Sequence, residues 1–187
     1  MWRNASTEFY ENQEENMFEV TLITDEYEEG KKIRTRTAVR SILSYQGKLV
    51  MVETNCGDYK FPGGGVEPGE TELEALRREI QEETGYIDVE IKELAGTAFE
   101  QNIDPDEPDT FFQMKSIYYN CKLLSEKRAP GVLDDYEEKL GFHPCFITAE
   151  ECYQRNHALV EKGFASPKEI PWLERETNVL HKIRKNF

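Results

Sequence analysis

Three glutamates, Glu79, Glu82 and Glu83, lie close together in the second quarter of the chain. Each residue of an α-helix turns by about 100°, so the three side chains share roughly one quarter to one third of the helix circumference. Carboxylates in such a patch repel each other, and a hard divalent cation with oxygen ligands relieves that repulsion. The spacing therefore fits a metal site, but three glutamates alone are more typical of a solvated acidic helix face.

The segment around these glutamates contains the signals that would position them. A loop rich in glycine and proline precedes them, over residues 59–70, and such a loop can bring backbone groups close to the carboxylates. Thr71 and Glu74 have the spacing of a capping box, which predicts that the helix begins there, and Gly85 is typical of a helix end. The core face of this helix is predicted from apolar residues at helical spacing: Leu73, Leu76 and Ile80.

The whole segment Gly64–Tyr86 resembles the Nudix box, G-x5-E-x7-R-E-U-x-E-E-x-G-U with U apolar. The fixed positions are met by Gly64, Glu70, Arg78, Glu79, Glu82, Glu83 and Gly85, and the first apolar position by Ile80. Tyr86 places an aromatic ring where an aliphatic side chain is usual, a departure that we expect to affect packing more than chemistry. Weaker resemblance to Nudix domains, bacterial members included, extends over residues 141–151 and 172–177.

This resemblance implies an α/β fold, the Nudix-type α/β/α sandwich around a mixed β-sheet. It also implies a pyrophosphohydrolase that acts on phosphoric anhydride bonds, hydrolysing a nucleoside diphosphate linked to another moiety. The substrate could be a (deoxy)nucleoside triphosphate, ADP-ribose, a nucleotide sugar or a dinucleoside polyphosphate. An alternative is a catalytically silent nucleotide sensor or scaffold, although such proteins usually lose box glutamates, and isoprenyl diphosphate isomerase chemistry would need further residues that the sequence does not locate.

Residue roles follow from the same resemblance. It implies Mg²⁺ or Mn²⁺ held by Glu79, Glu82, Glu83 and the Gly64 carbonyl, with Glu82 and Glu83 catalytic. Arg78 would orient a box carboxylate, and Glu70 would fix the junction between loop and helix.

Other residue roles stay open at this stage. The general base could be a box glutamate or, downstream, Glu100, Glu137 or Glu138, each of which could instead be a solvated loop residue. Arg34, Arg36 and Arg40 share one face of a predicted strand and could reach phosphates or simply face solvent. Among the aromatic residues, Tyr59, Phe61, Phe111 and Phe112 could stack on a base or belong to the core.

Strands and helices alternate along the chain, which predicts a sheet with helices on its faces. We predict strands at 18–24, 34–45, 49–52, 87–91 (running on towards 99), 111–124 and 146–147, and helices at 71–84, at 148–162 and from Pro171 onwards. Residues 101–110 are predicted to form an acidic surface loop rather than a lid. Residues 1–16 would form a polar N-terminal arm, followed by a single domain over 17–187.

Composition limits the partners. The chain has 187 residues and a formal net charge of −14, so binding to a nucleic-acid duplex or to an anionic membrane surface is not expected. No stretch predicts a membrane span or a secretion signal, and four scattered cysteines favour reduced thiols, so we expect a cytoplasmic protein. The edge strand at 18–24 could pair with a second copy to give a homodimer.

Overall fold

The computed structural model describes residues 17–131, 133–165 and 170–187, so the predicted arm at 1–16 lies outside the described residues. Seven strands form one sheet: β1 (Phe18–Ile23), β5 (Val89–Ile103), β6 (Thr110–Leu123), β2 (Lys32–Tyr45), β3 (Lys48–Glu53) and β4 (Tyr59–Lys60) in this order, with β7 (His143–Ile147) also paired to β3. The pairs β1–β5 and β2–β6 are parallel, and the other pairs are antiparallel. The sheet is therefore mixed, as the resemblance implied.

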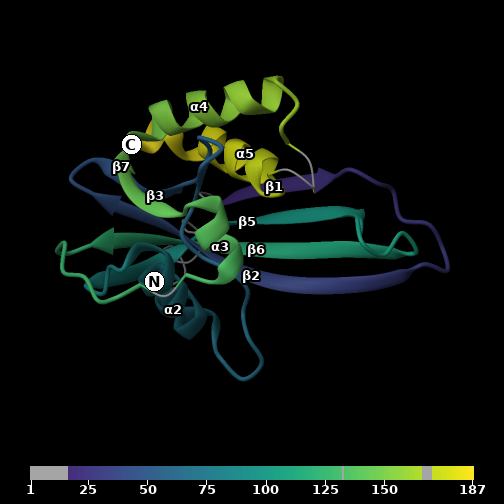
Figure 1. Ribbon diagram of the computed structural model, residues 1–187, viewed down its shortest axis with the longest axis horizontal. Coiled ribbons are helices and arrows are strands. Elements are labelled where there is room, and N and C mark those ends of the chain that lie inside the picture. Colours follow the sequence, from purple (N-terminus) through teal and green to yellow (C-terminus); the bar gives the residue numbers. More distant parts are fainter. Residues whose placement is uncertain (1–16, 132, 166–169) are drawn as a thin grey trace, which may run out of the picture.

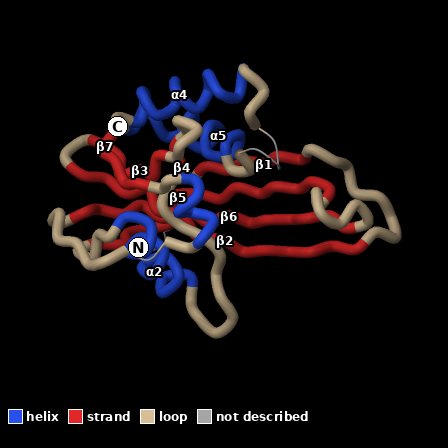
Figure 2. Tube along the Cα trace, in the orientation of Figure 1, coloured by secondary structure: helices blue, strands red, loops and turns tan. Residues whose placement is uncertain are grey.

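Helices cover both faces of this sheet. They are α2 (Glu72–Thr84), α3 (Asp135–Leu140), α4 (Ala149–Glu161) and α5 (Leu173–Ile183), and a 3₁₀ turn, Arg184–Asn186, follows α5. Figure 1 shows α4 and α5 on one side of the sheet and α2 on the other, and Figure 2 separates the helical layers from the strands by colour. The expected α/β/α sandwich is confirmed. Within the described residues, every helix is too short or too polar to cross a membrane.

Alternation along the central strands explains the two layers of core, because successive side chains of a strand point to opposite faces. On the α2 side the buried residues are Val39, Leu43, Val50, Leu76 and Ile80. On the side of α4 and α5 they are Ile42, Leu49, Met51, Val179 and Leu180. The β2–β3 hairpin turns at Gln46 and Gly47, both with positive φ.

The strands β2, β5 and β6 are long, at 14, 15 and 14 residues, and project beyond the helices (Figure 1). The acidic loop at their far end is shorter than predicted, because residues 101–103 belong to β5. Asp104 is buried rather than solvated, since it forms an ion pair with Arg34 and accepts a hydrogen bond of 3.0 Å from the Asp106 N–H. The start of this loop is thus anchored to β2.

Two helix predictions need correction. The predicted elements include no helix between the strands at 111–124 and 146–147, but α3 forms there, with a capping box between Asp134 and Glu137 and with Gly141 ending it in the left-handed region. The last helix begins at Leu173 rather than at Pro171, because the Leu173 N–H donates back to the carbonyl of Ile170 in a preceding turn.

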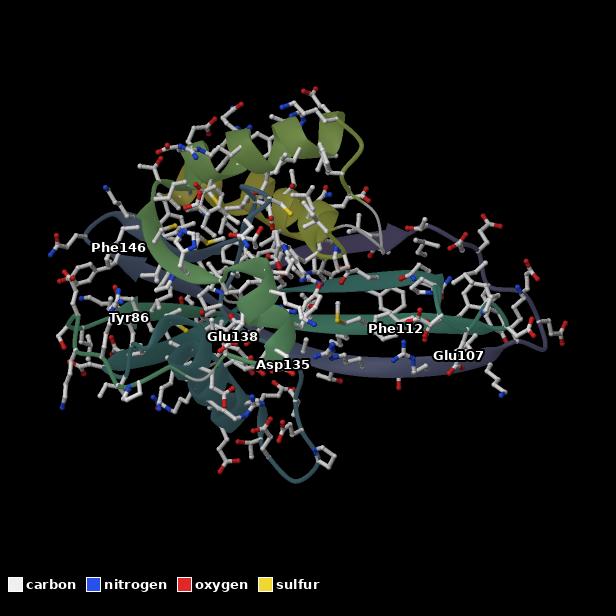
Figure 3. The ribbon with its side chains drawn as sticks, viewed as in Figure 1. Tyr86, Glu107, Phe112, Asp135, Glu138 and Phe146 are labelled. Carbon is white, nitrogen blue, oxygen red and sulfur yellow. The ribbon has the colours of Figure 1, made fainter. Side chains whose placement is uncertain are left out.

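Tyr86, the unusual last residue of the box, is buried between elements. Its ring lies 6.0 Å from that of Phe146 on β7 (Figure 3), and Arg128 donates a hydrogen bond of 2.7 Å to its hydroxyl. The aromatic ring therefore serves packing, as expected.

Candidate active site

The glycine-rich loop is held along the stretch of β2 that precedes its short pairing with β3. The Val39 N–H donates to the carbonyl of Gly64 at 2.9 Å, and the Ser41 N–H donates to that of Pro62 at 2.8 Å. Gly63 has a φ of +145°, and any side chain there would collide with the backbone of Val39. Only glycine permits this close approach, which brings the loop beside the second half of α2, at Glu79 and Glu83.

Glu79 lies against this loop. A methyl group on Gly64 would collide with the Glu79 carboxylate, so the backbone of residue 64 and that carboxylate share one small space. Burial raises the pKa of Glu79, and the nearby charge of Glu83 raises it further, while Arg78 opposes both effects. The carboxylate therefore lies where its negative charge is poorly solvated, a place that favours an additional cation.

Arg78 binds three carboxylates at once. Its guanidinium donates to Glu70 at 2.7 Å, to Glu79 at 2.8 Å and to Glu82 at 3.0 Å, and it also reaches the carbonyl of Gly65 at 3.1 Å. One positive charge is thus shared among three negative ones. These hydrogen bonds link the loop to the helix.

Glu83 has a different environment from the other two box glutamates. It is fully enclosed, one of its oxygens accepts a hydrogen bond of 2.9 Å from the Gly63 N–H, and the other forms an ion pair with Lys60. Burial raises the pKa of the Glu83 carboxyl, and Lys60 acts in the opposite direction. Within residues 17–131, 133–165 and 170–187, no three His, Cys, Asp or Glu side chains converge on one point. The three box glutamates are close but do not form one ligand set in this arrangement.

A cavity of about 520 Å³ lies beside Glu79 and Glu82; we call it the acidic cavity. Its charged lining residues are Glu67, Glu79, Glu82, Asp134 and Glu137 against Arg36 and Arg78, and Glu83 does not line it. Carboxylates outnumber cations in this lining, and carboxylate oxygens are the ligands that Mg²⁺ and Mn²⁺ prefer. The chemistry of this lining therefore suits a hard divalent cation, but among the described residues its carboxylates do not converge on one point in this arrangement.

A second cavity, of about 400 Å³, lies on the α5 side of the projecting strands; we call it the distal pocket. Arginines and aromatic rings share its lining: Arg34, Arg36, Arg40, Phe112, Tyr136 and Trp172. The Arg34 guanidinium lies 4.7 Å from the centroid of the Phe112 ring, which Figure 3 labels on the projecting part of β6. Arg36 lines the distal pocket and the acidic cavity alike, so the two cavities meet at its side chain.

Arg36 and Arg40 are cations without a carboxylate partner among the described residues. Burial lowers the pKa of Arg36 and the neighbouring charge of Arg40 lowers it further, while the charge of Glu79, which forms no ion pair with Arg36, opposes both effects. Arg40 donates one hydrogen bond to the carbonyl of Gly63, and its buried Nε atom has no partner. Two adjacent, partly desolvated guanidinium groups of this kind favour an anion with several oxygens.

The predicted general bases fall in different places. Glu100 lines the distal pocket and accepts a hydrogen bond of 2.6 Å from the buried Arg175, so one of its carboxylate oxygens is already occupied by this ion pair. Glu137 lines the acidic cavity, and burial raises the pKa of its carboxyl. Glu138, which Figure 3 labels, is one position further along α3 and lines neither cavity.

Of the two alternatives left open for Phe61, a stacking residue or a core residue, the structure places its ring in the core. Its side chain has no exposed surface and packs edge-on against Tyr118 at 5.7 Å between ring centroids. The strand–loop junction turns this ring into the core, and Phe112 is the predicted aromatic residue that lies in a cavity instead. Sequence reasoning also missed Lys60, because no local pattern links it to Glu83, 23 residues further along the chain.

Comparison with known proteins identifies the family of this chain. The NUDIX domain matches residues 32–165, more than half of the chain. The chain belongs to the Nudix family. Like the named members below, this Nudix protein is a hydrolase of pyrophosphate bonds.

Several curated Nudix proteins are similar to this one. It is 39% identical to the nucleoside triphosphatase NudI of Enterobacter sp. (strain 638) over 114 residues, which cover 57% of this chain and 80% of that protein. The NudI protein of Klebsiella pneumoniae is 43% identical over 115 residues, with the same coverage. An ADP-ribose pyrophosphatase of Methanocaldococcus jannaschii is 39% identical over 72 residues, 36% of this chain and 42% of that protein. Among solved structures, a Nudix hydrolase from Nitrosomonas europaea matches 78% of this chain and 90% of its own, with a TM-score of 0.48 and 16% identity.

Proposed function

We propose that this Nudix hydrolase cleaves a phosphoric anhydride bond of a nucleoside triphosphate with the help of Mg²⁺ or Mn²⁺. The observation that carries the proposal is the position of Arg36 at the junction of the acidic cavity and the distal pocket. A phosphate chain that crosses this junction meets Arg36 and Arg40, and it has carboxylates for a metal on one side and a pocket for the nucleoside on the other.

The distal pocket favours one nucleoside over a larger group. Its volume of about 400 Å³ is near the lower end of the range for ligand pockets, which spans about 300–1,000 Å³. The stacked pair of Arg34 and Phe112 offers a flat surface of the kind on which bases stack. The relatives matched over 80% of their length are named nucleoside triphosphatases, whereas the named ADP-ribose pyrophosphatase is matched over 42%.

In this proposal Glu79, Glu82 and the carbonyl of Gly64 hold the metal, and Glu83 joins them once its ion pair with Lys60 is broken. When bound, the metal would neutralise the charge of the phosphate chain and activate the attacking water. Arg78 keeps the Glu79 and Glu82 carboxylates in place through its hydrogen bonds. Glu82 stays a predicted catalytic residue, because its side chain is more accessible than that of Glu83.

We propose Glu137 as the general base. Its carboxylate lines the acidic cavity, and its raised pKa brings it closer to the range in which a carboxylate accepts a proton efficiently. One oxygen caps α3 by accepting from the Asp134 N–H at 2.9 Å, which fixes the orientation of the side chain and leaves the other oxygen for water.

The test is a phosphate- and pyrophosphate-release screen with Mg²⁺ and separately with Mn²⁺. The panel contains nucleoside triphosphates, ADP-ribose, nucleotide sugars and dinucleoside polyphosphates. Glu82→Gln is the inactive control, and Glu90→Gln, at an exposed position of β5, is the matched control. We expect nucleoside triphosphates to exceed the other substrates, with activity lost only in Glu82→Gln. A flat panel together with a metal-dependent rise in melting temperature would favour the sensor alternative.

We also propose that residues 17–187 act as one domain in the cytoplasm, and that two copies pair through β1. That strand lies at the edge of the sheet, and among the described strands β5 is its only partner, which makes its outer edge a candidate for pairing with a second chain. Light scattering at working concentration tests this arrangement, and the mass of a monomer would exclude it.

A further inference from the structure

The ion pair between Lys60 and Glu83 is buried in the centre of the candidate site. Its side chains are 6% and 1% exposed. The second oxygen of Glu83 accepts the Gly63 N–H at 2.9 Å, so both carboxylate oxygens are occupied by the protein's own donors. Glu83 can therefore bind a metal only if one of these donors moves away from its carboxylate.

Lys60 is the donor that can move away. The Gly63 N–H is fixed by a loop held along β2, whereas the ammonium group ends a flexible side chain. Lys60 also has partners besides Glu83: its Nζ atom lies 4.7 Å from the ring centroid of Phe142, 5.9 Å from that of Trp172 and 3.4 Å from the carbonyl of Gly63. Because aromatic faces attract cations, the ammonium keeps favourable contacts after it releases the carboxylate.

We propose that Lys60 is a resident counter-ion that competes with the divalent cation for Glu83 and so sets the metal affinity of the protein. This inference rests on the metal dependence in the proposed function. Glu79 and Glu82 face the acidic cavity, while Glu83 is neutralised behind it until the metal arrives. The exchange keeps a cation beside the buried carboxylate at every stage, so the charge of Glu83 is never left unpaired.

Competition makes a prediction that a merely structural role does not make. Removal of the ammonium should destabilise the metal-free protein and, at the same time, tighten metal binding. If Lys60 only stabilised the local fold, its removal would leave metal binding unchanged or weaken it.

The experiment measures Mn²⁺ binding by electron paramagnetic resonance of the free ion and by calorimetry. The variants are Lys60→Met, Lys60→Arg and Glu83→Gln, with Lys115→Met, at an exposed position of β6, as the control for net charge. We expect Lys60→Met to lower the Kd for Mn²⁺ at least tenfold and Lys60→Arg to keep it near the wild-type value. Lys115→Met should change it less than twofold.

A double-mutant cycle shows whether the effect passes through Glu83. Glu83→Gln should weaken Mn²⁺ binding. In the double variant, the addition of Lys60→Met should not tighten Mn²⁺ binding relative to Glu83→Gln alone. If Lys60→Met does not fold without metal, as judged by circular dichroism, Lys60→Gln replaces it with the same expected result. A Kd in Lys60→Met equal to or above that of the wild type would overturn the inference. A wild type that binds no Mn²⁺ at millimolar concentration would instead refute the metal dependence of the proposed function.

Discussion

The guanidinium of Arg36 lies directly over the backbone of Gly65, so that a methyl group on residue 65 would come within 2.8 Å of its Nη2 atom. Gly65 also forms a β-bridge with Ala38, which fixes this part of the loop to β2. The box therefore positions an arginine of the neighbouring strand as well as its own carboxylates. Substitutions on either side of this contact test whether the phosphate chain binds there.

Gly65→Ala should weaken substrate binding while the fold survives, because the added methyl group displaces the end of a flexible side chain. Arg36→Ala removes a charged donor, for which hydrogen bonds contribute about 1.5–3 kcal/mol, so we expect KM to rise by about tenfold or more. The double variant should be no worse than Arg36→Ala alone. Steady-state kinetics check this, and additive losses would show that the two residues act separately.

Glu137→Gln should lower kcat by about 10²–10⁴-fold, the usual contribution of a general base. Glu138→Gln should stay within a few-fold of the wild type, because Glu138 lines neither cavity. Glu100→Gln should reduce stability rather than turnover, since it weakens the contact with Arg175. Similar kcat values for Glu137→Gln and Glu138→Gln would exclude Glu137 as the base.

Glu82→Gln and Glu83→Gln should each lower turnover by orders of magnitude under saturating metal, yet they should differ in stability. The Glu82 side chain is partly exposed, so its substitution should change the free energy of unfolding little. Glu83→Gln leaves the buried ammonium of Lys60 without its counter-charge and should cost about 3 kcal/mol. Urea unfolding of both variants without metal measures the difference. Wild-type turnover in both variants would remove the box glutamates from the mechanism.

The stability of the metal-free protein should carry a pH dependence from Glu79. Burial raises the pKa of its carboxyl above the ordinary value of 4.5, so the native state keeps the proton up to a higher pH than the unfolded state does. This contribution to stability is fully present below pH 4.5 and is lost as the pH rises through the native pKa. Melting temperatures of the wild type should therefore fall relative to those of Glu79→Gln as the pH rises from 4.5 to 7. Mn²⁺ should reverse that trend, because it binds the ionised carboxylate. Parallel pH profiles for the two proteins without metal would contradict this assignment.

Much of this architecture could be predicted from local sequence. The helix α2 begins with the capping box at Thr71 and ends at Gly85 as predicted, because both signals act through backbone groups a few residues away. The two apolar faces of β2 and β3 follow from simple alternation. The position of Arg36 and Arg40 on one strand face was predictable for the same reason.

Contacts between distant segments could not be predicted. Spacing places Glu79, Glu82 and Glu83 in one patch of a helix, but Lys60 on β4 neutralises Glu83. Asp104 resembled a solvated loop residue because Arg34, its partner, lies 70 residues away. The helix α3 is only six residues long, too short for an apolar period to show, although Asp134, Glu137 and Gly141 carry its capping signals.

The parallel pairing of β2 with β6 has a consequence for the order in which the molecule forms. Lys32 faces Thr110 and Ser44 faces Lys122, so each pair joins residues 78 positions apart. Pairings of such long sequence separation close large loops and slow folding. During synthesis, β2 and its arginines cannot pair with β6 until β6 has left the ribosome. We therefore expect the arginine-lined face to be among the last parts of the sheet to become ordered.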